Sequence, residues 1–226
     1  MKLVIVIPAF NESAVIYSVL TSLPKKLKGI LQTEILVVDD GSTDNTAQLA
    51  KKARVNIARH WINRGVGAAT KTGLHWAKSK DADIVVTFDA DGQHDPREIR
   101  KIIDPVVQGR ADVVIGSRLK HKQSIPVDRY LINWFANIAT FILFGVTSTD
   151  TQSGLRAFSK KAVKIIDFKA DRMDYSSEIL LEAKKHQLKV VEIPTKAIYT
   201  TYSRGKGQKN INAIPTFARF LVKLFR

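Results

Sequence analysis

Short apolar runs alternate with helical patterns along the first half of this chain. The runs are rich in valine and isoleucine, which is typical of strands buried on both faces of a parallel sheet. Strands are predicted at residues 2–8, 34–38, 55–59, 84–88 and 112–116. Helices are predicted between them at residues 14–23, 44–54, 63–78 and 95–108. This alternation predicts a doubly wound, mostly parallel α/β sheet.

The second half is patterned less regularly. It predicts a short strand after Gly154, helices at 160–166 and 176–186, and strands at 189–193 and 196–199. Near the end of the chain, Arg219, Lys223 and Arg226 fall on one stripe of a predicted helix that also carries aromatic residues. We therefore expect one domain over residues 1–210, followed by a basic amphipathic helix over residues 211–226.

The segment from residue 130 to residue 149 contains no charged side chain. Its apolar part, 130–146, would span about 25 Å as a helix, which is shorter than the ~30 Å hydrocarbon core of a bilayer. Asn133, Asn137 and Thr140 are spaced so that they form one polar stripe. This pattern predicts an amphipathic helix that either packs in the core or lies in the membrane interface.

Composition narrows the classes of function. Apolar residues make up 45% of the 226 residues, and no cysteine is present, which excludes disulfides and thiolate chemistry. The formal net charge of +15 favours anionic partners, such as phosphorylated substrates or an anionic membrane surface. We expect no nucleic acid partner, because no recognition motif is present and only Tyr199 and Tyr202 accompany the basic loop near residue 204.

Acidic side chains recur where the predicted strands end, at the edge where α/β sheets bind ligands. These residues are Glu12, Asp39, Asp40, Asp89 and Asp91. Alternation along a strand would point Asp89 and Asp91 the same way. With the amide of Gln93, they offer oxygen ligands suited to Mg²⁺ or Mn²⁺. Taken alone, Asp89 and Asp91 fit a solvated turn equally well, and Asp39 and Asp40 also suit a simple turn.

Gly65 and Gly67 open the helix predicted at residues 63–78. Their spacing resembles a dinucleotide fingerprint, but Thr70 stands where the third glycine would be. We therefore reject a dinucleotide cofactor site at this turn.

Several motifs follow one another in order and together carry a resemblance. They are Pro8-Ala9-Phe10-Asn11-Glu12, Val38-Asp39-Asp40-Gly41-Ser42, Asp89-Ala90-Asp91-Gly92-Gln93-His94, Gly116-Ser117-Arg118 and Asp150-x-x-Ser153-Gly154-x-Arg156. With them, nearly the whole chain resembles the inverting family-2 glycosyltransferases, in the branch like dolichol-phosphate mannose synthase. The resemblance implies a GT-A fold and transfer of one sugar from a nucleotide sugar to a polyprenyl phosphate. The donor it implies is of the GDP-mannose, UDP-glucose or UDP-GlcNAc type.

The resemblance also implies a role for individual residues. The implied nucleotide-sugar contacts are Pro8, Phe10, Glu12, Val38, Asp40, Asp89 and Ala90. The implied metal ligands for Mg²⁺ or Mn²⁺ are Asp89, Asp91 and Gln93, and the implied catalytic residues are Asp91 and Arg118. Arg129, Arg204 and Lys206 are the implied acceptor-phosphate residues. Arg204 substitutes for an arginine that the family has earlier in the loop, where this chain has Thr200.

The chemistry implied is attack by an acceptor phosphate oxygen on the anomeric carbon, which needs no strong base because the phosphate is already ionised. The alternative is a family-2 enzyme with a hydroxyl acceptor, which would require a carboxylate base. His94 fits a loop-structuring role better than a metal-ligand role, and Glu178 suits acceptor positioning or a solvated surface equally well. The two amphipathic helices and the lipid acceptor predict a peripheral enzyme on the cytoplasmic face of an anionic membrane.

Overall fold

Seven strands form one sheet in a computed structural model that describes residues 1–120, 127–198 and 202. The strand order is β3-β2-β1-β4-β6-β5-β7, and β6 alone runs antiparallel to its neighbours. The strands are β1 (Lys2–Ala9), β2 (Gln32–Asp39), β3 (Asn56–Arg59), β4 (Ile84–Thr87), β5 (Val113–Ser117), β6 (Arg156–Ser159) and β7 (Val190–Pro194). The predicted mostly parallel α/β sheet is confirmed.

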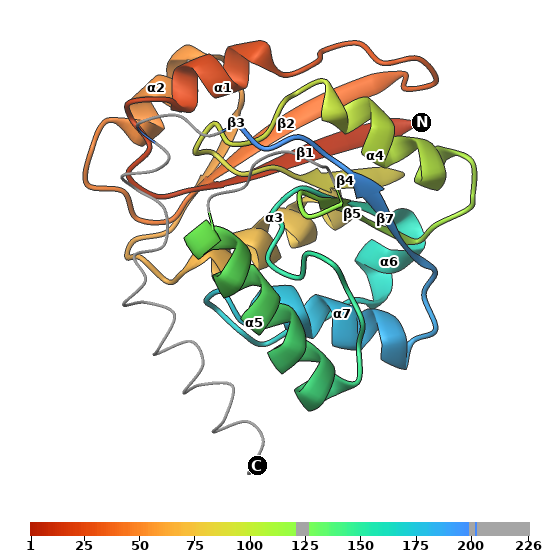
Figure 1. The fold of residues 1–226 in the computed structure, drawn as a ribbon. Coiled ribbons are helices and arrows are strands. Elements are labelled where there is room, and N and C mark those ends of the chain that lie inside the picture. Colours follow the sequence, from red (N-terminus) through yellow and green to blue (C-terminus); the bar gives the residue numbers. More distant parts are fainter. Residues whose placement is uncertain (121–126, 199–201, 203–226) are drawn as a thin grey trace.

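Helices cover both faces of this sheet (Figure 1). They are α1 (Ile16–Ser22), α2 (Thr46–Lys52), α3 (Val66–Ser79), α4 (Glu98–Val107), α5 (Val127–Phe144), α6 (Lys160–Ile165) and α7 (Tyr175–Lys185). Strand β1 divides its side chains between the two layers, as the two-residue period of a strand requires. Leu3 and Ile5 pack with α1, α2 and α4, whereas Val4 and Val6 pack with α3, α6 and α7.

The helix predicted at 130–146 begins earlier, at Val127, and has an unusual orientation. Its polar stripe faces the protein: Thr140 is fully buried and bonds the Ser177 hydroxyl at 2.9 Å. Its large apolar side chains face outward, with Ile142 68% exposed. The outward-facing apolar residues are Tyr130, Leu131, Trp134, Phe135, Phe141 and Ile142. Of the two placements predicted for this helix, the core or the membrane interface, the outward apolar face favours the interface, which stays a prediction.

No helix in the described part of the chain combines the length and apolar character needed to cross a bilayer. The strand predicted at 196–199 is reduced, within the described residues, to a single bridge between His94 and Ala197. The helix predicted at 211–226 lies outside the described residues, so the division between residues 210 and 211 stays a prediction.

Candidate active site

Two loops at the carboxyl edge of the sheet are fastened to each other. The loop after β1 reaches the loop after β2 through the Asn11 amide, which donates to the Ser42 hydroxyl, and the Glu12 amide, which donates to the Thr46 hydroxyl. In return, the Asn11 side chain accepts from the Thr43 amide at 2.9 Å. Asn11 adopts φ +54°, a left-handed conformation that asparagine tolerates. The two loops therefore form one preorganised wall.

The predicted nucleotide residues differ in how accessible they are to a ligand. Phe10 is exposed and Glu12 is partly buried, accepting a hydrogen bond from the Tyr202 hydroxyl at 2.9 Å. Pro8 is also partly buried, whereas the side chains of Val38 and Ala90 belong to the packed interior. A ligand could meet Val38 and Ala90 only through their backbone, while Phe10 and Glu12 offer side chains.

Asp40 bonds residues of the β3–α3 loop. Its carboxylate bonds His60 Nδ1 at 2.6 Å and accepts from the backbone amides of Arg64 and Gly65. The side chain is almost completely buried. In this conformation Asp40 fixes the β3–α3 loop, and its predicted contact with the nucleotide stays a prediction.

The glycines at the start of α3 serve chain packing. A Cβ on Gly65 would lie 2.3 Å from the Asp171 carbonyl oxygen, and a Cβ on Gly67 would lie 2.3 Å from the Ala170 carbonyl oxygen. Glu178 holds the same 169–171 segment, because its carboxylate accepts from the amides of Lys169 and Ala170 at 2.8 Å. Glu178 is thus not merely a solvated surface acid.

Asp89 and Asp91 follow β4 and have opposite electrostatic surroundings. Burial would raise the pKa of Asp89, but the hydrogen bond from His94 and the charges of His94, Arg118 and Arg156 hold it below its usual value. Burial and the neighbouring charge of Asp89 raise the pKa of Asp91. Two carboxylates that repel each other at a sheet edge are a feature that a bound cation would stabilise.

Neighbouring residues orient both carboxylates. His94 is buried, and its Nε2 lies 3.0 Å from Asp89 Oδ2, which makes His94 the loop-structuring residue that the sequence favoured. The Gln93 side-chain amide donates to Asp91 Oδ2 at 2.7 Å, and its backbone amide donates to Asp91 Oδ1. The described residues contain no group of three or more histidine, cysteine, aspartate or glutamate side chains that could hold a metal.

The absence of a side chain at Gly154 leaves room for the Asp89 carboxylate. A Cβ built on Gly154 would lie 2.1 Å from both carboxylate oxygens of Asp89. We expect Gly154→Ala to displace this carboxylate and to reduce turnover at least about tenfold, because small misplacements at a reacting centre are costly. Turnover per folded molecule measures the effect.

Gly109→Ala is the matched control for that substitution. Gly109 has φ +68° and no atom within 4 Å of its added Cβ, so alanine there strains the backbone without touching Asp89. We expect a lower melting temperature and unchanged turnover. If Gly154→Ala also keeps full turnover, the Asp89 position does not matter for the chemistry.

Arg118 is clamped by a residue whose role the sequence did not predict. Buried Asp150 accepts from Arg118 Nε and from an Arg118 terminal nitrogen, both at 2.8 Å, and also from the Arg118 backbone amide. Such a bidentate pair fixes the guanidinium plane. Arg118 therefore lies at the end of β5 with its orientation set by Asp150.

A second layer of hydrogen bonds holds the loop that carries Asp150. Glu192 of β7 accepts from the Ser148 hydroxyl and from the Thr149 amide and hydroxyl. Burial would raise the pKa of Glu192, but these bonds hold it below its usual value. Asn137 of α5 donates to the Thr149 carbonyl and accepts from the Thr151 amide. The polar stripe of α5 thus serves this loop.

Arg156 completes the interior beneath the acids. It is fully buried and donates to three carbonyl oxygens, those of Ser153, Ser176 and Thr151. Burial lowers the pKa of Arg156, and nearby charges, including those of Asp150 and Asp89, oppose this effect. This cation helps to keep Asp89 ionised.

Three predicted acceptor residues are not placed at the site. The backbone of Arg129 belongs to the first turn of α5, and its side chain is not described. Arg204 and Lys206 lie outside the described residues. Their roles remain predictions.

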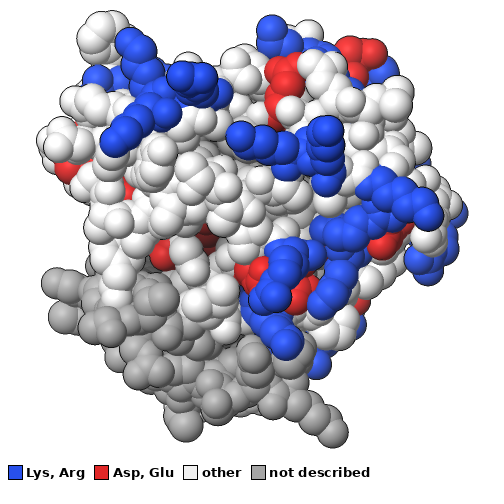
Figure 2. Space-filling view, turned by 90° about the horizontal axis from the view of Figure 1, so that it is seen from above, with Lys and Arg blue, Asp and Glu red and all other residues white. Residues whose placement is uncertain are grey.

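The face of the molecule above α1, α2 and α4 carries many lysine and arginine side chains, and acidic atoms are visible in a hollow on the same face (Figure 2).

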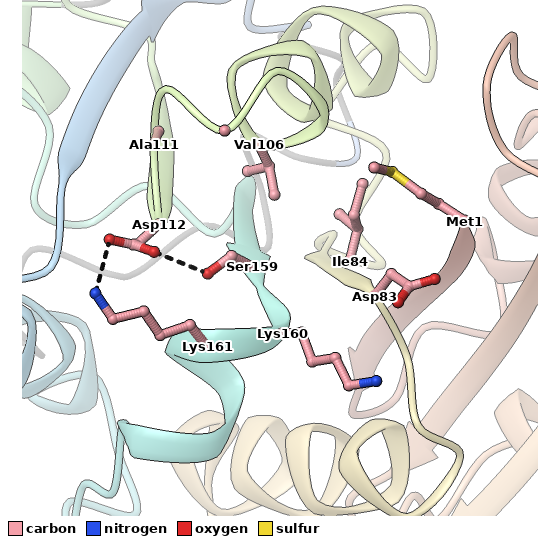
Figure 3. A pocket seen from close by; sticks show the side chains of 10 residues that line it. Met1, Asp83, Ile84, Val106, Ala111, Asp112, Ser159, Lys160 and Lys161 are labelled. Atoms are coloured by element: carbon pink, nitrogen blue, oxygen red, sulfur yellow. Dashed lines mark hydrogen bonds and ion pairs between the residues drawn. The ribbon is translucent and has the colours of Figure 1, made fainter.

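A separate pocket of about 410 Å³ lies at the opposite edge of the sheet, where β1, β4 and β5 begin. Asp83, Asp112 and Lys160 are among its lining residues, and Asp112 bonds Ser159 and Lys161 within it (Figure 3). The pocket is therefore separate from the acids at the carboxyl edge.

The mostly parallel sheet flanked by helices is the GT-A fold, which the chain shares with solved glycosyltransferase structures. Residues 4–166 match the family "Glycosyl transferase family 2". The chain belongs to this family and is a glycosyltransferase, which confirms the resemblance seen in its motifs.

Relatives and a solved structure match nearly all of this chain. An uncharacterized protein of Methanocaldococcus jannaschii is 41% identical over 98% of this chain and 92% of its own length. The UDP-N-acetylglucosamine–dolichyl-phosphate N-acetylglucosaminyltransferase of Methanococcus voltae is 38% identical over 96% of this chain and 94% of its own. Glucosyl-3-phosphoglycerate synthase from Mycobacterium tuberculosis, in complex with Mn²⁺, UDP-glucose and phosphoglyceric acid, shares the fold. Its TM-score is 0.72 at 20% identity, over 99% of this chain and 79% of that one.

Proposed function

We propose that the protein transfers one sugar from a nucleotide sugar to a polyprenyl phosphate, with inversion at the anomeric carbon. The observation that supports a lipid acceptor is the orientation of α5, which turns its apolar side chains outward and its polar side chains inward. Its outward face is apolar, and its inward Asn137 holds the loop of Asp150, which in turn clamps Arg118. Hydrogen bonds thereby connect α5, whose outward face suits lipid, to Arg118, the cation that an acceptor phosphate would meet. The dolichyl-phosphate acceptor in the name of the Methanococcus voltae relative supports the same class.

The donor would bind along the wall made by the loops after β1 and β2. Phe10 and Glu12 present side chains there, and the preorganised backbone of the Asn11 loop fixes their positions. The diphosphate would then reach the acids after β4. The nucleotide base and the sugar are open among the GDP-mannose, UDP-glucose and UDP-GlcNAc types.

Asp89 and Asp91 fit a divalent metal, Mg²⁺ or Mn²⁺. Their oxygens are the ligand type these ions prefer. Burial, together with the neighbouring charge of Asp89, raises the pKa of Asp91, and a bound cation would offset both effects. Gln93 is the predicted third ligand, and in this conformation its amide nitrogen orients Asp91. When bound, the metal supplies charge stabilisation to the diphosphate. The Mn²⁺ and UDP-glucose in the Mycobacterium tuberculosis structure support this assignment.

The acceptor supplies its own nucleophile. A phosphate oxygen forms the new bond to the anomeric carbon, and the bond from that carbon to the nucleoside diphosphate breaks on the opposite side. Because the phosphate is already ionised, no catalytic base is needed to remove a proton from the attacking oxygen. Arg118 would hold this phosphate against the donor, with Arg129, Arg204 and Lys206 as further predicted cations.

A donor screen tests the proposal. Purified protein would receive each nucleotide sugar with a short polyprenyl phosphate and Mg²⁺ or Mn²⁺, and the product would be extracted into an organic phase. We expect one donor to give a lipid-phosphate-linked sugar. Transfer to hydroxyl acceptors alone, with the lipid phosphate unconsumed, would contradict it.

The outward face of α5 supports peripheral attachment to a membrane, and the cytoplasmic face remains the predicted side. We expect the double substitution Phe135→Ser and Phe141→Ser to reduce binding to anionic vesicles at least about tenfold, because two large apolar side chains would no longer leave water. Co-sedimentation measures it. Leu31→Ser is the control, since Leu31 is 93% exposed but bonded by its backbone to Met1, at the opposite edge of the sheet. Equal loss in the control, or none in the double variant, would count against α5.

A further inference from the structure

The β3–α3 loop, residues 60–65, carries an apolar tip that the proposed chemistry does not use. Trp61 is 101% exposed and Ile62 is 70% exposed. Neighbouring exposed apolar residues of this size are unfavourable in water unless they meet another surface. The loop follows the carboxyl end of β3 and so lies at the same sheet edge as the candidate active site.

The backbone on either side of this tip is firmly held. Before it, His60 bonds Asp40 and the Thr72 hydroxyl through its two ring nitrogens. After it, the amides of Arg64 and Gly65 donate to Asp40. The exposure of Trp61 and Ile62 is therefore built into the fold.

Gly41 supports the loop from below. A Cβ on Gly41 would lie 2.5 Å from the Ile62 carbonyl carbon and 2.7 Å from the Asn63 nitrogen. The loop after β2 thus packs directly against the backbone of Ile62 and Asn63 at the tip.

Cations flank the tip. Arg59 is 61% exposed and pairs with Asp39, while Arg64 is 53% exposed and lies 3.9 Å from Asp171. Arg172, beside Asp171, is also exposed. An aromatic and an aliphatic residue between arginines match the layering of a bilayer interface, in which tryptophan sits at the headgroup level and arginine meets anionic headgroups.

The tip is connected to the inward side of α5 through a series of packed segments. Gly65 packs on Asp171, and the 171–172 segment leads directly into α7, whose Ser177 bonds Thr140 of α5. In Figure 1 the carboxyl ends of the strands and the first turn of α5 lie on the same side of the molecule. Two separate apolar features therefore border one side of the site.

We infer that the β3–α3 loop is a second membrane anchor, in which Trp61 and Ile62 enter the interface of an anionic bilayer and Arg59 and Arg64 meet its headgroups. This inference rests on the proposed function, since it assigns the loop to the same membrane as α5. Two anchors would fix the orientation of the protein relative to the membrane, whereas α5 alone would allow rotation about the helix axis. The candidate active site at the carboxyl edge of the sheet would then face the lipid phosphate.

Single-tryptophan variants test the position of each anchor separately. The chain has three tryptophans, Trp61, Trp76 and Trp134. One variant keeps only Trp61 (Trp76→Phe, Trp134→Phe) and a second keeps only Trp134 (Trp61→Phe, Trp76→Phe). Both are mixed with phosphatidylglycerol–phosphatidylcholine vesicles that carry brominated acyl chains, and tryptophan emission is recorded.

We expect the bromines to quench both variants. Quenching of Trp134 alone would overturn the second anchor and leave the proposed function standing. If neither is quenched and the protein stays in the supernatant, membrane docking itself fails, and with it this inference. The transfer reaction on a short, soluble acceptor then decides the proposed chemistry independently.

The double substitution Trp61→Ser and Ile62→Ser gives the matching functional test. We expect vesicle binding to fall about tenfold or more while the donor KM on a short soluble acceptor stays unchanged. Leu31→Ser again controls for the loss of an exposed apolar side chain. Unchanged vesicle binding, or a raised donor KM with binding retained, would assign the loop to the donor and overturn the inference.

Discussion

Asp91→Asn will reduce sugar transfer about a hundredfold or more while leaving the fold intact. The substitution removes one of the two charges that would hold a divalent metal on the leaving diphosphate, and stabilisation of developing charge usually contributes more to the rate than any other effect in such sites. Initial rates with saturating donor and acceptor, with the divalent ion varied, measure the loss.

The stability of the same variant has a definite expected direction. Burial and the charge of Asp89 raise the pKa of Asp91, so the ionised form is less stable in the folded protein than in the unfolded one. A neutral asparagine removes that cost, and we expect an equal or higher melting temperature near pH 7. The cost is lost as the pH falls through the raised folded-state pKa, and it is gone below the usual aspartate pKa, where Asp91 is protonated in both states.

Asp104→Asn is the matched control for Asp91→Asn. It makes the same chemical change on α4, where Asp104 pairs with Arg100 away from the acids after β4. Turnover should stay at the wild-type level. Full activity of Asp91→Asn, or full activity of the wild type in excess chelator, would contradict the metal-dependent account.

Asp150→Asn will reduce both stability and acceptor use. Asp150 is fully buried and makes two side-chain bonds and one backbone bond to Arg118. Breaking a buried ion pair by removing one partner costs about 3 kcal/mol, which corresponds to a melting temperature lower by roughly 6–12 °C. We expect the acceptor KM to rise at least about tenfold, because Arg118 is no longer held in one plane.

Arg118→Lys separates the two effects of the Asp150 change. Lysine keeps the positive charge beside Asp150 but loses the bidentate fork, so we expect a small loss of stability and a comparable rise in acceptor KM. Asp112→Asn is the control for Asp150→Asn. Like Asp150, Asp112 pairs with a basic side chain and accepts a hydrogen bond from a backbone amide, but it lies at the opposite edge of the sheet. A donor KM that rises while the acceptor KM stays constant would place Arg118 elsewhere in the reaction.

Local pattern was sufficient to predict much of the fold. The buried runs of β1 and β4 and the helices between strands follow from periodicity within about ten residues, and the structure confirms the sheet. The antiparallel β6 could not be foreseen, because its direction is set by pairing with β4 and β5 rather than by its four residues. The polar stripe of α5 was predicted, but its inward orientation reverses the usual rule.

The candidate site shows the same division. The motif around Asp89 and Asp91 could be recognised in the sequence because its residues are neighbours in the chain. The pairing of Arg118 with Asp150 joins residues 32 apart, and the bond from Tyr202 to Glu12 joins residues 190 apart. Nothing in local spacing specifies such partners. The close approach of Gly154 to Asp89 likewise depends on how β6 lies beside β4.

The phosphorus chemistry of the acceptor tests the central claim most directly. Purified protein, the donor identified in the screen and a short polyprenyl phosphate are incubated together, and the phosphorus resonance of the lipid is followed through a pH titration. A phosphomonoester shifts as its second proton dissociates, whereas a sugar phosphodiester does not. We predict that the titrating signal is replaced by a non-titrating one as nucleoside diphosphate appears in equal amount. Release of nucleoside diphosphate while the lipid remains a titrating monoester would contradict the account.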